Sequence, residues 1–182
     1  QHALEGFTYP LSSGGKLSIS GKIDRIDSLN LKNHNYLQVI DYKSGNKTFE
    51  LVDAYYGLDL QVLTYLSVAL KNYAEHIPLG AFYQPIIHSY QKANQDLLDN
   101  DNLLDKISEL HLNKNRLNGF VTVDPTVLAE VEPSIENSRK SLIYPVALKK
   151  DGNYNSYSQA FEESELEILL RYTHHMFKQA AE

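Results

Sequence analysis

The sequence predicts an α/β fold in which helices flank a mixed β-sheet. Two short segments, 16–26 and 36–43, carry the alternating or continuously apolar pattern of strands. Apolar residues then recur at helical spacing over 54–76, and a third strand-like segment follows at 79–90. The resulting order of strand, strand, helix and strand is typical of a sheet with helices packed beside it.

The first predicted strand ends at an unusual point. A Gly14–Gly15 turn precedes it, and its apolar residues keep to one face until Ile26, which falls on the polar face. This break in phase predicts a bulge or a strand end just after Asp24. Residues 27–35 are interpreted as a polar connection to the next strand.

The second predicted strand, 36–43, ends in "VIDYKSG". Side chains alternate along a strand, so Asp41 and Lys43 share one face with Leu37 and Val39. If this strand returns antiparallel to the first, Asp24 and Asp41 meet near one end of the sheet.

The segment 54–76 is predicted to be a helix that begins as late as Gly57, because glycine weakens a helix by about 1 kcal/mol relative to alanine. Gln61 and Tyr65 are four residues apart and therefore lie on one face of this helix. In the following strand, Pro85 predicts an edge or bulged position.

The remaining segments are predicted more coarsely. We expect a surface helix at 94–112, a strand at 116–124 and a closing amphipathic helix at 158–182, while 133–152 cannot be assigned. His174 and His175 point about 100° apart on a helix, which is unlike a two-histidine metal site, and we expect both to be solvated.

Size and composition predict one domain over 1–182. The chain has 42% hydrophobic and 22% charged residues, and Gln61 and Thr64 interrupt its longest apolar run, so no membrane span is expected. It starts without methionine or a signal-peptide pattern, which predicts a fragment of a longer protein. The absence of cysteine predicts no iron–sulfur cluster in this fragment and fits the cytoplasm.

The net charge of −6 argues against a protein that coats nucleic acid by bulk electrostatics. The distribution of charge is uneven, however, because residues 16–47 carry six basic and three acidic side chains. This locally basic part of the chain coincides with the unusual strand ends.

The two strand ends together carry the residues that metal-assisted phosphodiester cleavage requires. Asp24, Asp41 and the backbone carbonyl of Tyr42 are hard oxygen donors for Mg²⁺, with Mn²⁺ as a second option. Lys43 can orient the attacking water or offset charge on the phosphate. The alternative is an ordinary surface ion pair between the aspartate and the lysine, worth about 0–1 kcal/mol.

The motifs "GKIDRID", "VIDYKSG" and "YYGLDLQVLTYL", followed by "GAFYQPI", resemble the RecB-like branch of the PD-(D/E)XK nuclease superfamily. They are most similar to the RexB/AddB subunit of bacterial ATP-dependent helicase–nucleases. The close resemblance covers residues 16–87 and is diffuse beyond them. It implies a restriction-endonuclease-like mixed sheet flanked by helices.

The resemblance also implies roles for particular residues. Asp24 and Asp41 would be metal ligands, Lys43 the catalytic lysine, and Gln61 with Tyr65 a pair that places DNA. Arg25 and Asp27 would support the first ligand, although a surface salt bridge between them is an equal alternative. Tyr65 could alternatively belong to the core.

At the level of the whole protein, the resemblance implies DNA and a RexA/AddA-type helicase–nuclease subunit as partners in a bacterial cytoplasm. It implies exonuclease action, on the strand with a 5′ end, in double-strand-break repair and recombination. Three features depart from the family. The chain has no cysteine for the iron–sulfur cluster that AddB proteins commonly carry, so the RexB type is the better match. A further upstream ligand is expected before this chain, with Glu5 a weak substitute, and no phosphate-binding loop for ATP is present.

Two other function classes stay open at this point. The same fold could be a catalytically inactive module that binds DNA or the partner subunit, because fold alone does not guarantee activity. Hydrolysis of free nucleotides with carboxylate-held Mg²⁺ is a third class.

Overall fold

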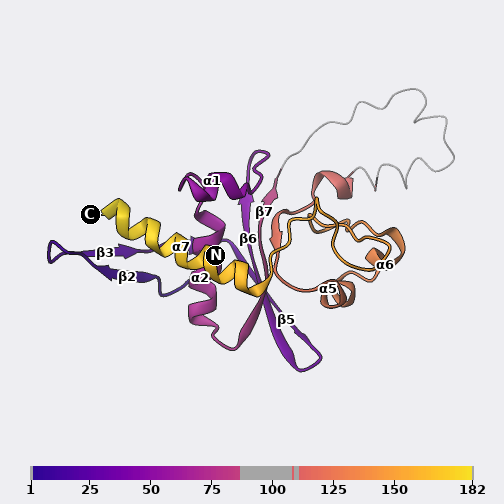
Figure 1. Cartoon of the computed structure of the whole chain (residues 1–182), viewed down its shortest axis with the longest axis horizontal. Coiled ribbons are helices and arrows are strands. Elements are labelled where there is room, and N and C mark those ends of the chain that lie inside the picture. Colours follow the sequence, from indigo (N-terminus) through magenta and orange to yellow (C-terminus); the bar gives the residue numbers. More distant parts are fainter. Residues whose placement is uncertain (1, 87–107, 109–110, 182) are drawn as a thin grey trace.

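The computed structural model describes residues 2–86, 108 and 111–181. At its centre lies a four-stranded sheet in the order β5–β6–β7–β8 (Figure 1). β6 (His34–Lys43) pairs antiparallel with β5 (Arg25–Leu31) and parallel with β7 (His76–Pro85), which pairs antiparallel with β8 (Asn118–Val121). The predicted α/β class with a mixed sheet is confirmed.

Two shorter pairs of strands precede this sheet. β1 (His2–Ala3) pairs with β4 (Lys22–Ile23), and β2 (Phe7–Pro10) pairs with β3 (Lys16–Ile19) in an antiparallel hairpin. The segment 16–26, predicted as one strand, is therefore divided. Its last break falls at Asp24, which stands between β4 and β5, and this confirms the predicted strand end.

The prediction of a polar connection over residues 27–35 is wrong. β5 and β6 continue to a two-residue turn at Lys32 and Asn33, whose φ angles of 49° and 66° suit a tight hairpin turn. β5 is an edge strand of its sheet, so Ser28 and Asn30 are exposed within a regular ladder. Polar residues are tolerated there because an edge strand borders solvent.

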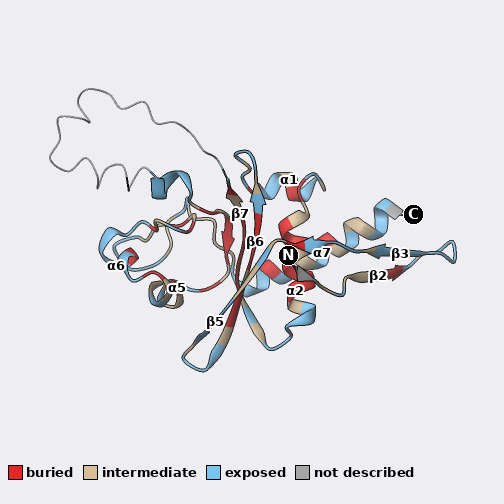
Figure 2. Cartoon of the chain, turned by 180° about the vertical axis from the view of Figure 1, so that it is seen from behind, coloured by how far each residue is buried: buried red, intermediate tan, exposed pale blue. Residues whose placement is uncertain are grey.

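The central strand β6 is buried on both faces, as its sequence pattern predicted. Leu37 and Val39 belong to one hydrophobic cluster, whereas Tyr36 and Ile40 belong to a second cluster on the opposite face. Figure 2 shows buried residues concentrated along β6, β7 and α2. A strand covered on both faces needs a layer of other elements on each side.

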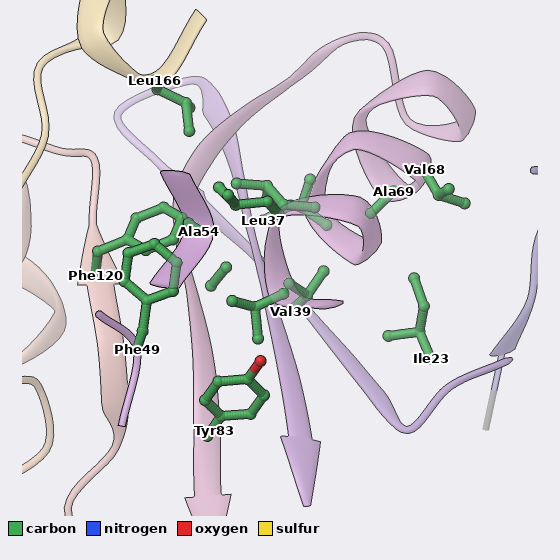
Figure 3. Packing of buried hydrophobic residues seen from close by; sticks show 14 residues of the cluster. Ile23, Leu37, Val39, Phe49, Ala54, Val68, Ala69, Tyr83, Phe120 and Leu166 are labelled. Carbon is green, nitrogen blue, oxygen red and sulfur yellow. The ribbon is translucent and has the colours of Figure 1, made fainter. Parts of the chain in front are cut away.

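The layer on the Val39 face is made by helices. α2 (Gln61–Asn72) connects β6 to β7 and packs against both strands, and α7 (Glu163–Ala181) packs against α2. Figure 3 shows Leu37, Val39 and Tyr83 gathered with Ala69 of α2 and Leu166 of α7 in this cluster. The closing helix predicted at 158–182 is thereby confirmed.

The layer on the Ile40 face is less regular. α5 (Pro125–Val131) starts at Asp124, whose side chain accepts hydrogen bonds from the backbone of Thr126 and Val127. α6 (Ser134–Ser138) follows within the segment that the sequence left unassigned. β8 confirms the strand predicted at 116–124, whereas most of the predicted surface helix at 94–112 lies outside the described residues.

The helix predicted over 54–76 is divided in two. α1 (Leu51–Tyr55) ends before Gly57, which has a φ of +72°, and α2 begins only at Gln61. A positive φ stops a helix and is easiest for glycine, so the chain turns here. Leu58, which lies inside the segment predicted to be helical, is 75% exposed in the linker between the two helices.

Pro85 does not mark an edge strand. β7 has β6 on one side and β8 on the other, and Pro85 is its last residue. The prediction is wrong because proline is also tolerated at a strand terminus, where few ladder hydrogen bonds follow.

His174 is not solvated as predicted, although His175 is exposed. The Tyr9 hydroxyl bonds to His174 Nδ1, and Ser67 Oγ lies 2.8 Å from Nε2, so the ring joins β2, α2 and α7. Phe7 packs against the ring edge at a centroid distance of 4.4 Å. Within the described residues, no helix is long and apolar enough to cross a membrane.

We predict that the link through His174 weakens in acid. Burial, followed by the nearby Lys178, lowers the pKa of His174 from its ordinary 6.5. The folded state therefore takes up this proton only at a lower pH than the unfolded chain does. The stability contribution is present above pH 6.5 and is lost as the pH falls through the lowered pKa.

Denaturant unfolding at a series of pH values checks this prediction against His174→Gln, which cannot titrate. The wild type should lose more free energy of unfolding than the variant does between pH 7 and 5. Parallel pH curves for the two proteins would contradict it.

Candidate active site at the end of the central strands

Asp24 and Asp41 come together because β5 stops where β6 continues. Arg25 pairs with Ile40, so the next position along the register brings Asp24 beside Asp41. The backbone N–H of Tyr42 lies beyond the last pair of the β5–β6 ladder and donates to Asp24 Oδ2 at 3.1 Å. The carboxylate thus takes the place of the missing strand and is held at the end of β6.

Asp41 and Lys43 lie on the same face of β6, as predicted. Asp41 is only 4% exposed, and the Lys43 ammonium lies 2.5 Å from its Oδ2. This approach lacks the geometry of a hydrogen bond, so Oδ2 is a buried oxygen with an ionic neighbour but without a hydrogen-bond donor. The pair is therefore partly buried, unlike the exposed surface pair considered as the alternative.

Gln61, the first residue of α2, connects this pair to the helix. Its Oε1 accepts from Lys43 Nζ at 2.7 Å, while its Nε2 donates to Asp41 Oδ1 at 3.3 Å and to the Tyr65 hydroxyl at 2.9 Å. An ammonium can only donate, so this is the amide orientation that satisfies the contacts. The predicted common face of Gln61 and Tyr65 is confirmed.

The donor set at the strand end fits a hard cation. In an extended strand the N–H and C=O of one residue point to the same side, so the Tyr42 carbonyl faces the side on which Asp24 lies. Asp41 Oδ2, a buried oxygen without a hydrogen-bond partner, belongs to the residue that precedes Tyr42 on the same strand, so two carboxylates and one carbonyl are available at this strand end. No group of three or more His, Cys, Asp or Glu capable of holding a metal occurs among the described residues. Mg²⁺ tolerates so few protein ligands because it keeps several waters.

Arg25 and Asp27 form an ion pair of 2.7 Å on the other face of the sheet. Gln38 Nε2 donates to Asp27 Oδ2 at 3.0 Å, and Arg25 Nη1 approaches the Tyr42 hydroxyl at 3.5 Å. The hydrogen bond and charge of Asp27 raise the pKa of Arg25, which keeps the guanidinium charged. These residues contact the β6 face that points away from Asp41.

Sequence reasoning missed a second lysine–carboxylate pair beside the first. Asp59 is 5% exposed and accepts a hydrogen bond from the Tyr83 hydroxyl, while Lys47 Nζ lies 3.1 Å from its Oδ1. The sequence feature that could have indicated this pair is Asp59 itself, which stands two residues before Gln61 in "GLDLQ". Its partner Tyr83 becomes visible only in the register, where it pairs with Asp41.

Both lysines lie close to the ring of Tyr83. Lys43 Nζ lies 5.2 Å and Lys47 Nζ 4.9 Å from its centroid, a distance at which a cation is attracted to the ring. Burial, followed by the hydrogen bond to Asp59, raises the pKa of Tyr83 far above its ordinary range. The hydroxyl is therefore a permanent donor to Asp59.

A fold and site of this kind define a class of proteins. The chain matches the model of the PD-(D/E)XK nuclease superfamily over residues 1–174, and it belongs to this superfamily. The predicted resemblance and the predicted fold are confirmed.

Among curated proteins, the chain is similar to one subunit of the ATP-dependent helicase/deoxyribonuclease of several bacteria. The identity is 35% to the Clostridioides difficile protein and 34% to that of Thermoanaerobacter sp. strain X514, in each case over 94% of this chain. The Clostridium novyi protein is 37% identical over 84% of the chain. These alignments cover 13–15% of the relatives' length, so the chain spans about a seventh of them.

We predict that Tyr83→Phe destabilises the protein by about 1.5–3 kcal/mol, because a hydrogen bond to a buried charged group is lost. Asp59 Oδ2 already has no hydrogen-bond partner, so the carboxylate would keep only Lys47. Tyr65→Phe, which removes a hydroxyl from a less buried position, is the matched control. Denaturant unfolding of both variants measures the difference, and equal losses would contradict the prediction.

Proposed function

We propose that this chain is the nuclease domain of a Mg²⁺-dependent deoxyribonuclease that hydrolyses DNA phosphodiester bonds. The observation that carries the proposal is the juxtaposition of Asp24, Asp41 and Lys43 at the end of the central strands. Membership of a nuclease superfamily supports the reaction class. Relatives named as deoxyribonuclease subunits support DNA as the substrate.

Asp24 Oδ2, Asp41 Oδ2 and the Tyr42 carbonyl would hold the cation, with Mn²⁺ as an alternative to Mg²⁺. When bound, the divalent cation supplies Lewis-acid polarisation of the phosphate and a more acidic water. Burial of Asp41 strengthens its attraction for a cation because little solvent screens the charge.

Lys43 would stabilise charge that develops on the phosphate and orient the attacking water. Its ammonium is already held by Asp41 and by Gln61 Oε1, so little reorganisation is needed at the moment of reaction. A lysine has three donors, and at least one stays available for the substrate. A site of this kind can cleave a phosphodiester without forming a covalent enzyme intermediate.

Gln61 and Tyr65 would place the DNA by fixing the mouth of the site at the start of α2. Both side chains are partly exposed, and the 2.9 Å hydrogen bond between them gives them one shared geometry. Arg25 and Asp27 would act indirectly, by holding Tyr42 through its hydroxyl on the opposite face.

At the level of the whole protein, the proposal is a helicase–nuclease subunit of the RexB/AddB type with a RexA/AddA-type partner. It would act as an exonuclease on the strand with a 5′ end, during double-strand-break repair and recombination in the bacterial cytoplasm. The names of the relatives support the subunit and its partner.

The second candidate is an inactive nuclease-fold module that binds DNA or the partner subunit. The specific observation in its favour is that no third ionisable ligand joins Asp24 and Asp41 in the part of the chain that is described. Cleavage assays separate the two candidates directly.

We predict that Asp41→Ala and Lys43→Ala each reduce Mg²⁺-dependent DNA cleavage by about 10²–10³-fold or more, because each removes a charge needed at the reacting phosphate. The measurement is degradation of end-labelled linear DNA by the complete two-subunit complex. One strand should lose its cleavage while ATP-driven unwinding persists. Lys32→Ala, which breaks an exposed ion pair with Glu130, is the control.

Unchanged cleavage of both strands in Asp41→Ala and Lys43→Ala would overturn the catalytic proposal and favour the binding module. Cleavage of free nucleotides without cleavage of DNA would select nucleotide hydrolysis instead.

We also predict that Gln61→Leu lowers the maximal cleavage rate by about 10²-fold, because Lys43 and Asp41 lose the amide that orients them. Single-turnover cleavage of the same DNA measures this rate. Tyr65→Phe should have a smaller effect, since Gln61 keeps both of its contacts to the ion pair. Equal rates for Gln61→Leu and wild type would show that Lys43 needs no such support.

A further inference from the structure

We propose that Lys47 binds the DNA phosphate next to the scissile phosphate, and that Asp59 and Tyr83 are the positioning residues that hold it there. The inference rests on the proposed nuclease function. It adds a second phosphate contact, at a residue that lies outside the motifs quoted above.

The geometry gives Lys47 a fixed position close to the reacting centre. Its ammonium is 3.1 Å from Asp59 Oδ1 and 4.9 Å from the Tyr83 centroid, and Lys43 lies 5.2 Å from the same centroid. Because both ammonium groups lie about 5 Å from the same ring centroid, they are at most about 10 Å apart. We infer that two ammonium groups this close together contact neighbouring phosphates of one DNA strand.

The burial of the carboxylate explains why the lysine is held so firmly. Asp59 is buried, its Oδ1 receives both the Tyr83 hydroxyl and Lys47, and its Oδ2 has no hydrogen-bond partner. A buried carboxylate attracts its cation strongly because water screens it little. The ammonium is thereby anchored before DNA arrives.

Exposure distinguishes the two lysines. The Lys43 side chain is 24% exposed and is shared between Asp41 and Gln61, whereas the Lys47 side chain is 38% exposed. An ammonium has three N–H donors. Asp59 lies on one side of the Lys47 ammonium, so the remaining donors can face solvent. An anchored, exposed cation beside the reacting centre is suited to a backbone phosphate.

The test uses cleavage of a short end-labelled single-stranded oligonucleotide by the complete two-subunit complex, without ATP, over a range of salt concentrations. Only the cleavage products that depend on Lys43 are followed, because the partner subunit has a nuclease of its own. Lys47→Ala should raise the half-saturating oligonucleotide concentration about fivefold with little change in the maximal rate. The slope of log affinity against log salt should fall by about 0.7, the value for one lost phosphate contact on a single strand. Lys47→Arg should restore the wild-type slope.

Lys47→Ala leaves Asp59 buried without its cation, so a second variant guards against misfolding. The double variant Lys47→Ala/Asp59→Asn deletes the whole ion pair and leaves the net charge of the chain unchanged. It should show the same loss of slope as Lys47→Ala. Lys32→Ala/Glu130→Gln, which deletes a distant ion pair in the same way, should keep the wild-type slope.

The outcomes separate this inference from the proposed function. Suppose that Lys47→Ala and Lys47→Ala/Asp59→Asn both keep the wild-type slope, while Lys43→Ala abolishes cleavage. This result would overturn the phosphate contact but not the proposed nuclease function. A lower maximal rate at an unchanged half-saturating concentration would also overturn it, because Lys47 would then act on the reacting centre. Full cleavage by Lys43→Ala would overturn the proposed function itself.

Discussion

The carboxylate of Asp41, buried at the end of a strand that is covered on both faces, imposes the constraint on which the site depends. A buried charge is costly unless it is paired and hydrogen-bonded. Lys43 supplies the pairing from the same face of β6, and Gln61 supplies the hydrogen bond from the first turn of α2. The position of α2 against β6 and β7 is therefore tied to the chemistry, since the helix must start where its first side chain reaches the ion pair.

The two faces of β6 carry different residues because side chains alternate along a pleated strand. The face of Val39 carries the ion pair and packs beneath α2, whereas the face of Ile40 carries Gln38, which bonds to Asp27 and to the Tyr144 hydroxyl. A slip of one residue in the register would exchange these faces and place Asp41 in the wrong layer. The tight turn at Lys32 and Asn33 fixes the register of β5 against β6 and so protects the site.

Much of this site could be predicted from the sequence because local periodicity determines it. The alternation along β6 placed Asp41 with Lys43, the phase break placed Asp24 at a strand end, and helical spacing placed Gln61 with Tyr65. Other features depend on contacts between segments distant in sequence. The hydrogen bonds of His174 require Tyr9 and Ser67, and the pairing of Asp59 with Tyr83 requires the register of β7. The late start of α2 was missed because apolar spacing continues through a turn that Gly57 makes with a positive φ.

The charges around Tyr83 form two nearly balanced pairs, and this balance explains how the site can stay folded before it meets any cation. Asp41 is offset by Lys43 and Asp59 by Lys47, so neither buried carboxylate is left without a counter-ion. Asp24 lies at the rim, where solvent reduces the cost of its charge. A divalent cation at Asp24 and Asp41 would compete with Lys43 for the buried carboxylate. Gln61 Oε1 would then keep the displaced ammonium within reach of the substrate. In the proposed nuclease, the amide would thus let one buried aspartate serve both the stability of the fold and the binding of a cation.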